Sequence, residues 1–368
     1  MSRRRLDVVI VGAGPSGLLL ACELALAGVR PTVLERDTQP SDEHKANFLV
    51  GQVVRALDIR GLYRAITGDP GPPRPVSHGV FAGMELPLVG VQNNPLYALP
   101  IPQPQLVRLL VARARDLGVD VRWGHEVVEM EVDSEISTLT VAAPEGSYHL
   151  SARYLVGADG GRSIVRKRAG IGFPGVTMPT HTRIADVRIP DESRRDGGWQ
   201  IPGFGRIPFG LNSFERGAIF YIERSPQYSS IITMEFDDEA ADDTRPLTID
   251  EMRHSVRRII GVDVQFDGPS GPGPHALRRL NVQNTRQADQ YRVGNILLVG
   301  DSAHVHPPIG GPGLNLGLQD AMNVGWKLAA EVKGWAPQGL LDTYYSERHP
   351  VGQRVMMHSL SQLMLITP

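Results

Sequence analysis

The chain has 368 residues, and its 41% hydrophobic and 21% charged residues are typical of a globular protein with one large or two medium domains. Its formal net charge of −2 gives no reason to expect nucleic acid or an anionic membrane as a partner. A single cysteine, Cys22, excludes an internal disulfide and agrees with a reducing compartment. Its apolar helical surroundings favour a small core side chain.

The first residues, Ser2 to Leu6, place arginines ahead of an apolar run and so look like a secretion signal. Asp7 interrupts that run, and cleavage after it would remove glycines that the expected fold needs. No apolar stretch in the sequence is long enough to span a bilayer. We therefore expect a cytoplasmic protein that has no membrane partner.

A βαβ unit is expected first, with a buried strand over 8–11, a helix over 18–27 and a strand over 31–35. The later elements, in chain order, are helices over 53–62 and 105–117, a loop over 68–77, strands over 120–123, 138–142 and 154–157, half-exposed strands near 182–189, 218–223 and 231–236, a helix over 249–260, a loop over 268–275, a buried strand over 295–299, a helix from about 313 and an apolar helical stretch over 360–366. The chain thus leaves an α/β domain, builds an antiparallel sheet domain and returns.

The turn between the first strand and the first helix has the spacing of a dinucleotide site. Gly12 permits the tight turn, Gly14 lets a pyrophosphate approach, and Gly17 lets the helix pack closely against the strand. Glu35 follows at the end of the second strand, where its carboxylate can bind a ribose hydroxyl. This unit alone does not distinguish NAD from FAD.

The segment from Gly300 to Asn315 follows a buried strand, turns through prolines and glycines, and enters a helix at about Gly313. The Asp301 carboxylate can accept hydrogen bonds from sugar-like hydroxyls, since an unpaired carboxylate beside a buried strand would be costly. The alternative role of Asp301 is a cap for the turn that follows it. The N–H groups at the start of the helix favour negative charge, which suits the anionic ring of a reduced flavin.

A third motif, Asp159-Gly160 with Ser163 and Arg166 in phase, follows another buried strand. With these three motifs in order, the sequence resembles the class A flavoprotein aromatic monooxygenases, the p-hydroxybenzoate hydroxylase-like family, and above all its aromatic-polyketide hydroxylases. The resemblance covers nearly the whole chain. Lesser matches are Pro102-Gln103, Glu126-Val127 and residues 345–350.

The resemblance implies FAD as cofactor and NAD(P)H as co-substrate. The residues expected to bind FAD are Gly12, Gly14, Pro15, Ser16, Gly17, Glu35, Arg36, Lys45, Gln103, Val127, Asp159, Asp301, Pro308, Gly311, Gly313, Leu314 and Asn315. Within the family, Gln103 would contact the flavin nucleotide, the Val127 backbone the adenine, and Asp301 the ribityl chain. Lys45 stands where the family usually has arginine, so it keeps the charge but loses the bidentate fork.

The implied fold is α/β, a Rossmann-like FAD-binding domain of the p-hydroxybenzoate hydroxylase-like fold with an inserted antiparallel β-sheet substrate domain. We expect residues 1–70, 98–173 and 285–368 to form the FAD-binding domain, and 71–97 and 174–284 to form the substrate-binding sheet domain. The further C-terminal domain that polyketide hydroxylases tend to carry is expected to be absent.

The implied reaction is hydroxylation of an aromatic, polyketide-like substrate with NAD(P)H and O2 through a flavin C4a-hydroperoxide, as in antibiotic biosynthesis. The sequence assigns no catalytic residue, and His304 and His306 near Asp301 lack the further ligands of a metal site. Two alternatives remain open: a flavin reductase or dehydrogenase without productive oxygenation, and a non-enzymatic flavin-binding module. The sequence does not predict the oligomeric state.

Overall fold

We describe the protein from a computed structural model, which describes residues 5–43, 45–132, 136–195, 197–236, 245–271 and 275–367. The arginines at positions 3 and 4 and part of the loop expected over 268–275 lie outside these residues. The chain forms two compact units. The first comprises Met1–Val76, Val91–Gly175 and Thr285–His358, and the second comprises Ser77–Gly90, Val176–Asn284 and Ser359–Pro368.

The first unit is built on a mixed sheet whose main path runs β19–β20–β10–β1–β2–β7, with β9 pairing with β10 and β8 with β9. The strands are β1 (Arg5–Val11), β2 (Thr32–Glu35), β7 (Asp120–Trp123), β8 (Glu126–Val132), β9 (Ser137–Ala142), β10 (Tyr148–Gly157), β19 (Arg292–Val293) and β20 (Ile296–Leu298). The run from β20 to β7 is parallel, as the continuous apolar segments predict.

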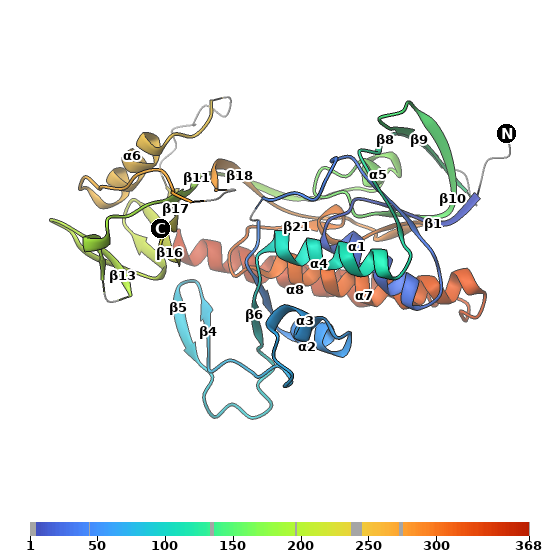
Figure 1. The fold of residues 1–368 in the computed structure, drawn as a ribbon, viewed down its shortest axis with the longest axis horizontal. Helices are drawn as coiled ribbons and strands as arrows, with labels where there is room; N and C mark the ends of the chain where they lie inside the picture. The colour runs from blue at the N-terminus through green and yellow to red at the C-terminus, as the bar shows by residue number, and fades with distance from the viewer. Residues whose placement is uncertain are drawn as a thin grey trace. The chain divides into compact units, whose positions relative to one another are not determined.

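Helices of the first unit cover this sheet, and α1 packs against both α4 and α7 (Figure 1). The helices are α1 (Pro15–Leu26), α2 (Gln52–Ile59), α3 (Leu62–Thr67), α4 (Gln103–Asp116), α5 (Ile164–Arg168), the 3-10 turn η2 (Gly300–Ser302), α7 (Pro312–Lys333) and α8 (Thr343–Ile366), and the short strands β3 (Phe48–Val50), β6 (Ala98–Pro100) and β21 (His304–Val305) complete the unit. The helix expected over 53–62 is two helices, because Gly61 adopts a left-handed φ of +73°. Cys22 is fully buried, and burial raises the pKa of its thiol to about 12.

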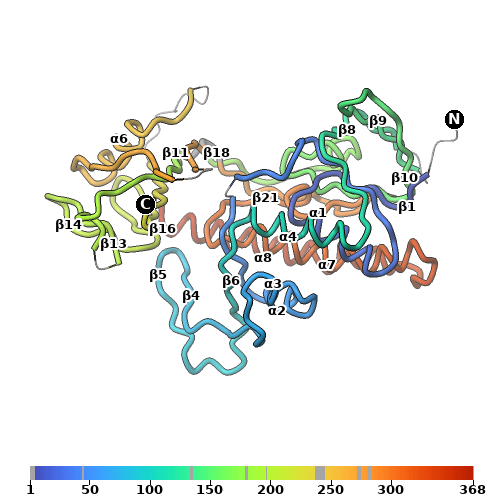
Figure 2. Tube along the Cα trace, viewed as in Figure 1, coloured from blue at the N-terminus to red at the C-terminus, as the bar shows by residue number. Residues whose placement is uncertain are grey.

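The second unit contains an antiparallel sheet in the order β15–β16–β17–β11–β18. Its elements are β4 (His78–Phe81), β5 (Met84–Pro87), β11 (Gly175–Val187), η1 (Asp191–Ser193), β12 (Arg194–Arg195), β13 (Gly198–Ile201), β14 (Gly205–Pro208), β15 (Gly210–Phe214), β16 (Gly217–Ser225), β17 (Tyr228–Glu235), α6 (Ile249–Ile260) and most of β18 (Leu277–Gln287). Its core includes Trp199, Tyr221 and Met252. Figure 2 traces the chain as it leaves the first unit after α5 and returns to it at the end of β18.

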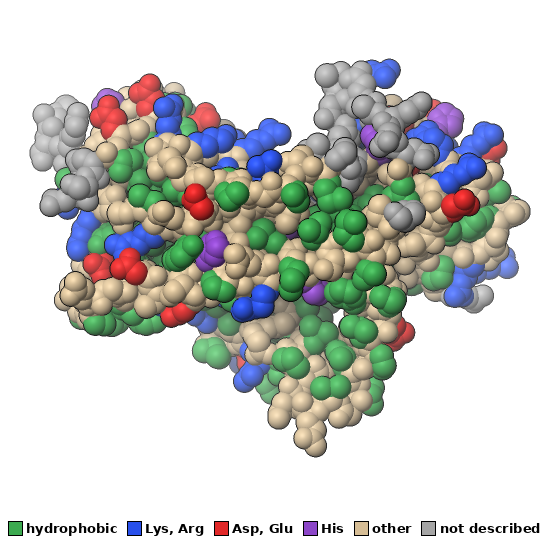
Figure 3. Space-filling view, turned by 180° about the vertical axis from the view of Figure 1, so that it is seen from behind, with side chains coloured by type: hydrophobic (Ala, Val, Ile, Leu, Met, Phe, Trp, Pro, Cys, Tyr) green, Lys and Arg blue, Asp and Glu red, His purple; other side chains and the backbone are tan. Residues whose placement is uncertain are grey.

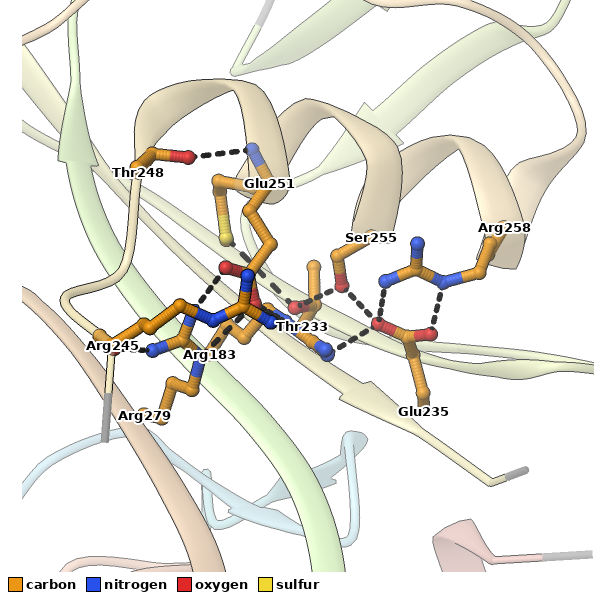
Figure 4. A network of polar contacts seen from close by, with 10 residues as sticks. Arg183, Thr233, Glu235, Arg245, Thr248, Glu251, Ser255, Arg258 and Arg279 are labelled. Atoms are coloured by element: carbon orange, nitrogen blue, oxygen red, sulfur yellow. Dashed lines mark hydrogen bonds and ion pairs between the residues drawn. The ribbon is translucent and has the colours of Figure 1, made fainter. Parts of the chain in front are cut away.

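A buried polar network ties α6 to the sheet (Figure 4). Glu235 accepts hydrogen bonds from Arg183, Arg258 and the Ser255 hydroxyl, and Arg183 also donates to Glu251 on α6. Burial alone would raise the pKa of Glu235, but the bonds from Arg258 and Ser255 outweigh it and lower the pKa. These contacts satisfy the buried charges between helix and sheet.

The bounds of the two units differ from those of the expected domains in several segments. Residues 71–76 and 91–97 belong to the first unit, where the Val76 N–H donates to the Leu96 carbonyl at 2.9 Å. Residues 359–368 belong to the second unit, where Gln362 accepts a hydrogen bond from the Ala82 N–H at 2.9 Å.

None of the described helices is both long and apolar enough to cross a membrane. Positive and negative side chains both occur on the face of the molecule shown in Figure 3, in keeping with the small net charge.

Candidate cofactor site

The glycine turn after β1 has the geometry that the dinucleotide motif requires. Gly12 has a φ of +108°, and a Cβ there would lie 2.3 Å from the Ala158 carbonyl oxygen. A Cβ on Gly17 would lie 2.1 Å from the Gly12 carbonyl oxygen, so any side chain would push α1 away. A Cβ on Gly14, by contrast, would meet nothing within 4 Å. Gly14 therefore borders open space at the N-terminus of α1, which has no side-chain cap, and this arrangement fits a pyrophosphate.

Glu35 ends β2 beside this turn. Its carboxylate accepts hydrogen bonds from the Ala13 N–H at 2.7 Å and the Asp37 N–H at 3.0 Å. Residues 36–42, which follow Glu35 in the chain, line a shallow depression that is open to solvent. Because a carboxylate can accept further bonds, Glu35 remains able to bind a ribose hydroxyl.

The two expected cations lie at the surface of the first unit. The Arg36 side chain is exposed, and Lys45 pairs with Glu43 at 3.2 Å between Nζ and Oε2. An exposed pair of this kind is weak, so Lys45 can exchange it for a phosphate.

Asp159 is a half-buried residue whose two carboxylate oxygens differ in their hydrogen bonding. Its Oδ2 accepts hydrogen bonds from the N–H groups of Ile164 and Val165 at 2.7 and 3.3 Å, and so caps α5. Its Oδ1 is buried without a partner among the described residues, and burial raises the pKa of the group. Buried polar atoms normally have partners, so the unpaired oxygen indicates a missing donor such as a ribityl hydroxyl.

Asp301 differs from the sequence-based expectation in its surroundings. It lies in η2 and is exposed, and its carboxylate makes no hydrogen bond with another described residue. The 3-10 turn points Asp301 away from the buried strand β20. The expected free-energy cost of an unpaired buried carboxylate therefore does not arise at this position. The alternative role of Asp301, as a cap for the turn, would require a hydrogen bond from its carboxylate to a backbone N–H, and none is present among the described residues. The carboxylate is therefore available to a ligand.

Hydrogen bonds of Arg166 and Ser302 connect the turn that carries Asp159 to the turn that carries Asp301. Arg166 donates to the Ser302 carbonyl at 2.8 Å and to the Gly161 carbonyl at 2.9 Å, and its guanidinium lies over the Phe173 ring. The Ser302 hydroxyl donates to the Gly157 carbonyl at 2.6 Å. The segments that carry Asp159 and Asp301 are thus held as one support.

Helix α7 begins at Pro312, close to the expected Gly313, after Gly311 with a φ of +65°. It has no side-chain cap, so its first N–H groups are free of side-chain acceptors. Asn315 is buried and uses its side chain structurally, accepting from the Val50 N–H at 2.8 Å and donating to the Gly311 carbonyl at 3.0 Å. Leu314 is half-buried and Pro308 is exposed beside this turn.

The remaining expected residues sit at element boundaries. The Gln103 N–H donates to the Ala46 carbonyl at 2.8 Å where α4 begins. Val127 is buried in β8, just before the register shift that separates it from Glu129. All of the residues expected to bind FAD belong to the first unit.

The two histidines of the motif lie in different surroundings. His304 is buried and donates from Nε2 to Asp320 at 2.6 Å, and His306 has Nδ1 2.8 Å from the Pro307 carbonyl oxygen. The described part of the chain contains no group of three side chains suited to a metal ion. Sequence reasoning missed Asp320, which lies eight residues after the start of α7 and carries no motif spacing of its own.

Comparison with known proteins identifies the family. The family model described as FAD binding domain matches residues 5–359. The chain belongs to this family. As a class A FAD-dependent aromatic monooxygenase, it takes FAD as cofactor, in a family that uses NAD(P)H, and it has the p-hydroxybenzoate hydroxylase-like fold that was expected.

Several relatives are similar over nearly the whole chain. The 12-dehydrotetracycline 5-monooxygenase/anhydrotetracycline 6-monooxygenase of Streptomyces rimosus is 40% identical over 99% of this chain and 70% of its own length. The structure of an aromatic hydroxylase from angucycline biosynthesis superposes with a TM-score of 0.85 at 34% identity, covering 98% of this chain and 69% of that one. A Diels–Alderase of pyrroindomycin biosynthesis also has a TM-score of 0.85 at 34% identity, covering 98% and 73%.

Proposed function

We propose that this monooxygenase hydroxylates an aromatic, polyketide-like substrate with NAD(P)H and O2. The proposal rests on the similarity to the tetracycline monooxygenase, which extends over 99% of the chain and so includes both compact units. A match confined to the FAD fingerprint would say nothing of the substrate. We also propose that the first unit is the FAD-binding domain and the second the substrate domain.

The residues of the first unit fit the successive parts of FAD. We propose that the Gly14 turn and Glu35 hold the pyrophosphate and the adenosine ribose, and that Asp159 and Asp301 hold the ribityl hydroxyls. The start of α7 then presents N–H groups to the flavin ring. When bound, FAD supplies the redox chemistry, taking electrons from NAD(P)H and passing oxygen from O2 to the substrate.

The second unit offers a surface suited to planar rings. One sheet face is covered by α6, and side chains on the other face alternate with it along β11, β16 and β17. Ile184 and Phe220 both lie opposite Ile232 in the strand register, and all three are half-buried. We propose that these apolar side chains contact the aromatic rings of the substrate.

A direct test is NAD(P)H oxidation by the purified protein with a panel of phenolic and quinoid polyketides. We expect FAD to be released on denaturation, NAD(P)H oxidation to accelerate with the right substrate, and a product heavier by one oxygen atom. Equally fast oxidation without substrate, giving only hydrogen peroxide, would establish the flavin reductase. A protein that binds FAD but oxidises no NAD(P)H would be the flavin-binding module.

A second candidate function comes from the Diels–Alderase similarity. A dialkyldecalin synthase of Streptomyces rugosporus is 37% identical over 96% of this chain, so the same fold serves a carbon–carbon bond-forming relative. Incubation with the same substrates in the absence of NAD(P)H separates the two functions. A product of unchanged mass would favour cyclisation, and a strict requirement for NAD(P)H and O2 would favour hydroxylation.

A further inference from the structure

A buried carboxylate on α7 holds both ends of the turn that carries Asp301. Asp320 has no exposed surface. Its Oδ2 accepts hydrogen bonds from His304 Nε2 at 2.6 Å and from the Gly300 N–H at 3.3 Å, and its Oδ1 accepts from Arg348 Nε at 2.8 Å. Gly300 and His304 are the residues on either side of the Asp301 segment. One side chain therefore fixes where this segment starts and where it ends.

The His304 ring depends on this contact for its orientation. Its Nδ1 is buried and has no hydrogen-bond partner among the described residues, so the bond to Asp320 is the polar contact that holds the ring. Arg348 is also buried, and its positive charge balances the Asp320 carboxylate. Because buried polar groups need such partners, loss of Asp320 would leave His304 Nε2 and Arg348 Nε without their acceptor.

Nothing comparable holds Asp301 itself. The carboxylate is exposed and makes no hydrogen bond with a described residue, so its position depends on the backbone of the turn. Between the two ends that Asp320 holds, Arg166 and Gly157 fix Ser302. The turn is thus a rigid support for one outward-facing acid.

We infer that Asp320 is a positioning residue for FAD: without reaching the cofactor, it sets the place of the Asp301 carboxylate that binds it. This inference rests on the proposed role of Asp301 in the FAD site. Preorganisation of this kind raises affinity because the ligand does not have to order the turn when it binds. Removal of Asp320 should therefore weaken FAD binding even in a protein that remains folded.

The rival explanation is that Asp320 only clamps α7 to α8. The chain offers a comparison for that role in a more exposed pair, because Lys327 on α7 donates to Glu347 on α8 at 2.7 Å and the Glu347 side chain is half exposed. The Lys327 ammonium is buried like the guanidinium of Arg348, yet the hydrogen bonds of this pair reach no residue of the Asp301 turn. A clamp effect should appear in Glu347→Gln as well as in Asp320→Asn, whereas a positioning effect should appear in Asp320→Asn.

The experiment compares Asp320→Asn, Glu347→Gln and the parent in two measurements well below their melting temperatures. Hydrogen exchange of residues 299–305 in the FAD-free protein reports on the turn, and titration with FAD gives the dissociation constant. We expect Asp320→Asn to exchange faster in this segment and to bind FAD about tenfold or more weakly. Glu347→Gln should match the parent within about twofold in both measurements.

The outcomes are distinct. Parent-like exchange and affinity in Asp320→Asn, or equal losses in both variants, would overturn the inference. A parent protein that binds no FAD would instead refute the proposed function. If Asp320→Asn does not fold, His304→Phe and His304→Gln replace it: Phe removes the donor and Gln keeps one, so only Phe should weaken FAD binding, and equal affinities would again overturn the inference.

Discussion

At the residue scale, burial of the Asp159 carboxylate costs stability, and we propose that the same carboxylate binds FAD. Its Oδ1 is buried without a described partner, and burial raises its pKa above the ordinary value of 3.8. A raised carboxyl pKa means that its contribution to stability is present below the unfolded value and is lost as pH rises through the folded value. Asp159→Asn keeps an oxygen that can cap α5 and removes the charge.

We therefore expect FAD-free Asp159→Asn to melt at a higher temperature than the parent at pH 7, and the difference to shrink as pH falls toward 4. FAD should bind more weakly, because the carboxylate no longer accepts from the ribityl chain. Thermal melts across pH and FAD titrations check both effects. A lower melting temperature at pH 7 would show that the carboxylate has a stabilising partner without FAD.

Unlike Asp159, Asp301 should have no effect on the stability of the FAD-free protein, since its carboxylate is exposed and makes no hydrogen bond with a described residue. A hydrogen bond to a charged group contributes about 1.5–3 kcal/mol, so Asp301→Ala should weaken FAD binding by roughly tenfold or more. The melting temperature of the FAD-free protein should not change. Asp116→Ala, at an exposed site on the end of α4, is the control. Full FAD affinity with a lower melting temperature would restore the capping role.

At the scale of elements, the start of α7 has two glycines that serve different purposes. Gly311 has a φ of +65° and open space around it, so Gly311→Ala should cost about 1–2 kcal/mol of stability through its backbone. Gly313 has no such strain, but a Cβ there would lie 3.2 Å from His306 Nε2 and would narrow the approach to the helix N–H groups.

We expect Gly313→Ala to lower the reduction potential of bound flavin and to divert part of the NAD(P)H oxidation to peroxide, because the helix N-terminus would stabilise the reduced anion less well. Gly311→Ala should lower the melting temperature more than Gly313→Ala does. Potentiometric titration and peroxide assays distinguish the two variants. An unchanged potential and unchanged coupling in Gly313→Ala would mean that its glycine serves only the turn.

At the scale of the whole molecule, the two units have separate hydrophobic cores. Leu20 on α1 belongs to the first core and Trp199 on β13 to the second, and both side chains are buried. Truncation of a large core side chain costs about 2–5 kcal/mol in either core. All of the residues proposed to bind FAD lie in the first unit, so the two truncations should change the FAD dissociation constant to different extents.

Leu20→Ala should raise the FAD dissociation constant, because α1 carries the pyrophosphate turn. Trp199→Ala should leave that constant within about twofold of the parent while abolishing the acceleration of NAD(P)H oxidation by substrate. FAD titration and steady-state oxidation assays at a temperature where both variants are folded check this. A comparable loss of FAD affinity in Trp199→Ala would show that the second core supports the cofactor site.

The sequence by itself determined the family, the cofactor and most elements of the parallel sheet, because these depend on local signals. Buried strands such as residues 8–11 are continuously apolar, and Gly12 and Gly17 are required by backbone contacts that side chains would obstruct. Local spacing likewise placed the start of α7 within one residue. The break of the expected helix over 53–62 at Gly61 was readable in principle, since glycine readily adopts the left-handed conformation.

The tertiary structure decided what each of these residues contacts. Asp301 was expected beside a buried strand and is exposed, whereas Asp320, which no motif marks, is buried between His304 and Arg348. His304 lies 16 residues before Asp320 and Arg348 lies 28 residues after it, beyond the reach of one helix or strand period, so no local pattern specifies these contacts. A contact inside the second unit shows the same dependence on tertiary structure, because Gln362 is joined to Ala82 by a hydrogen bond across 280 residues of sequence.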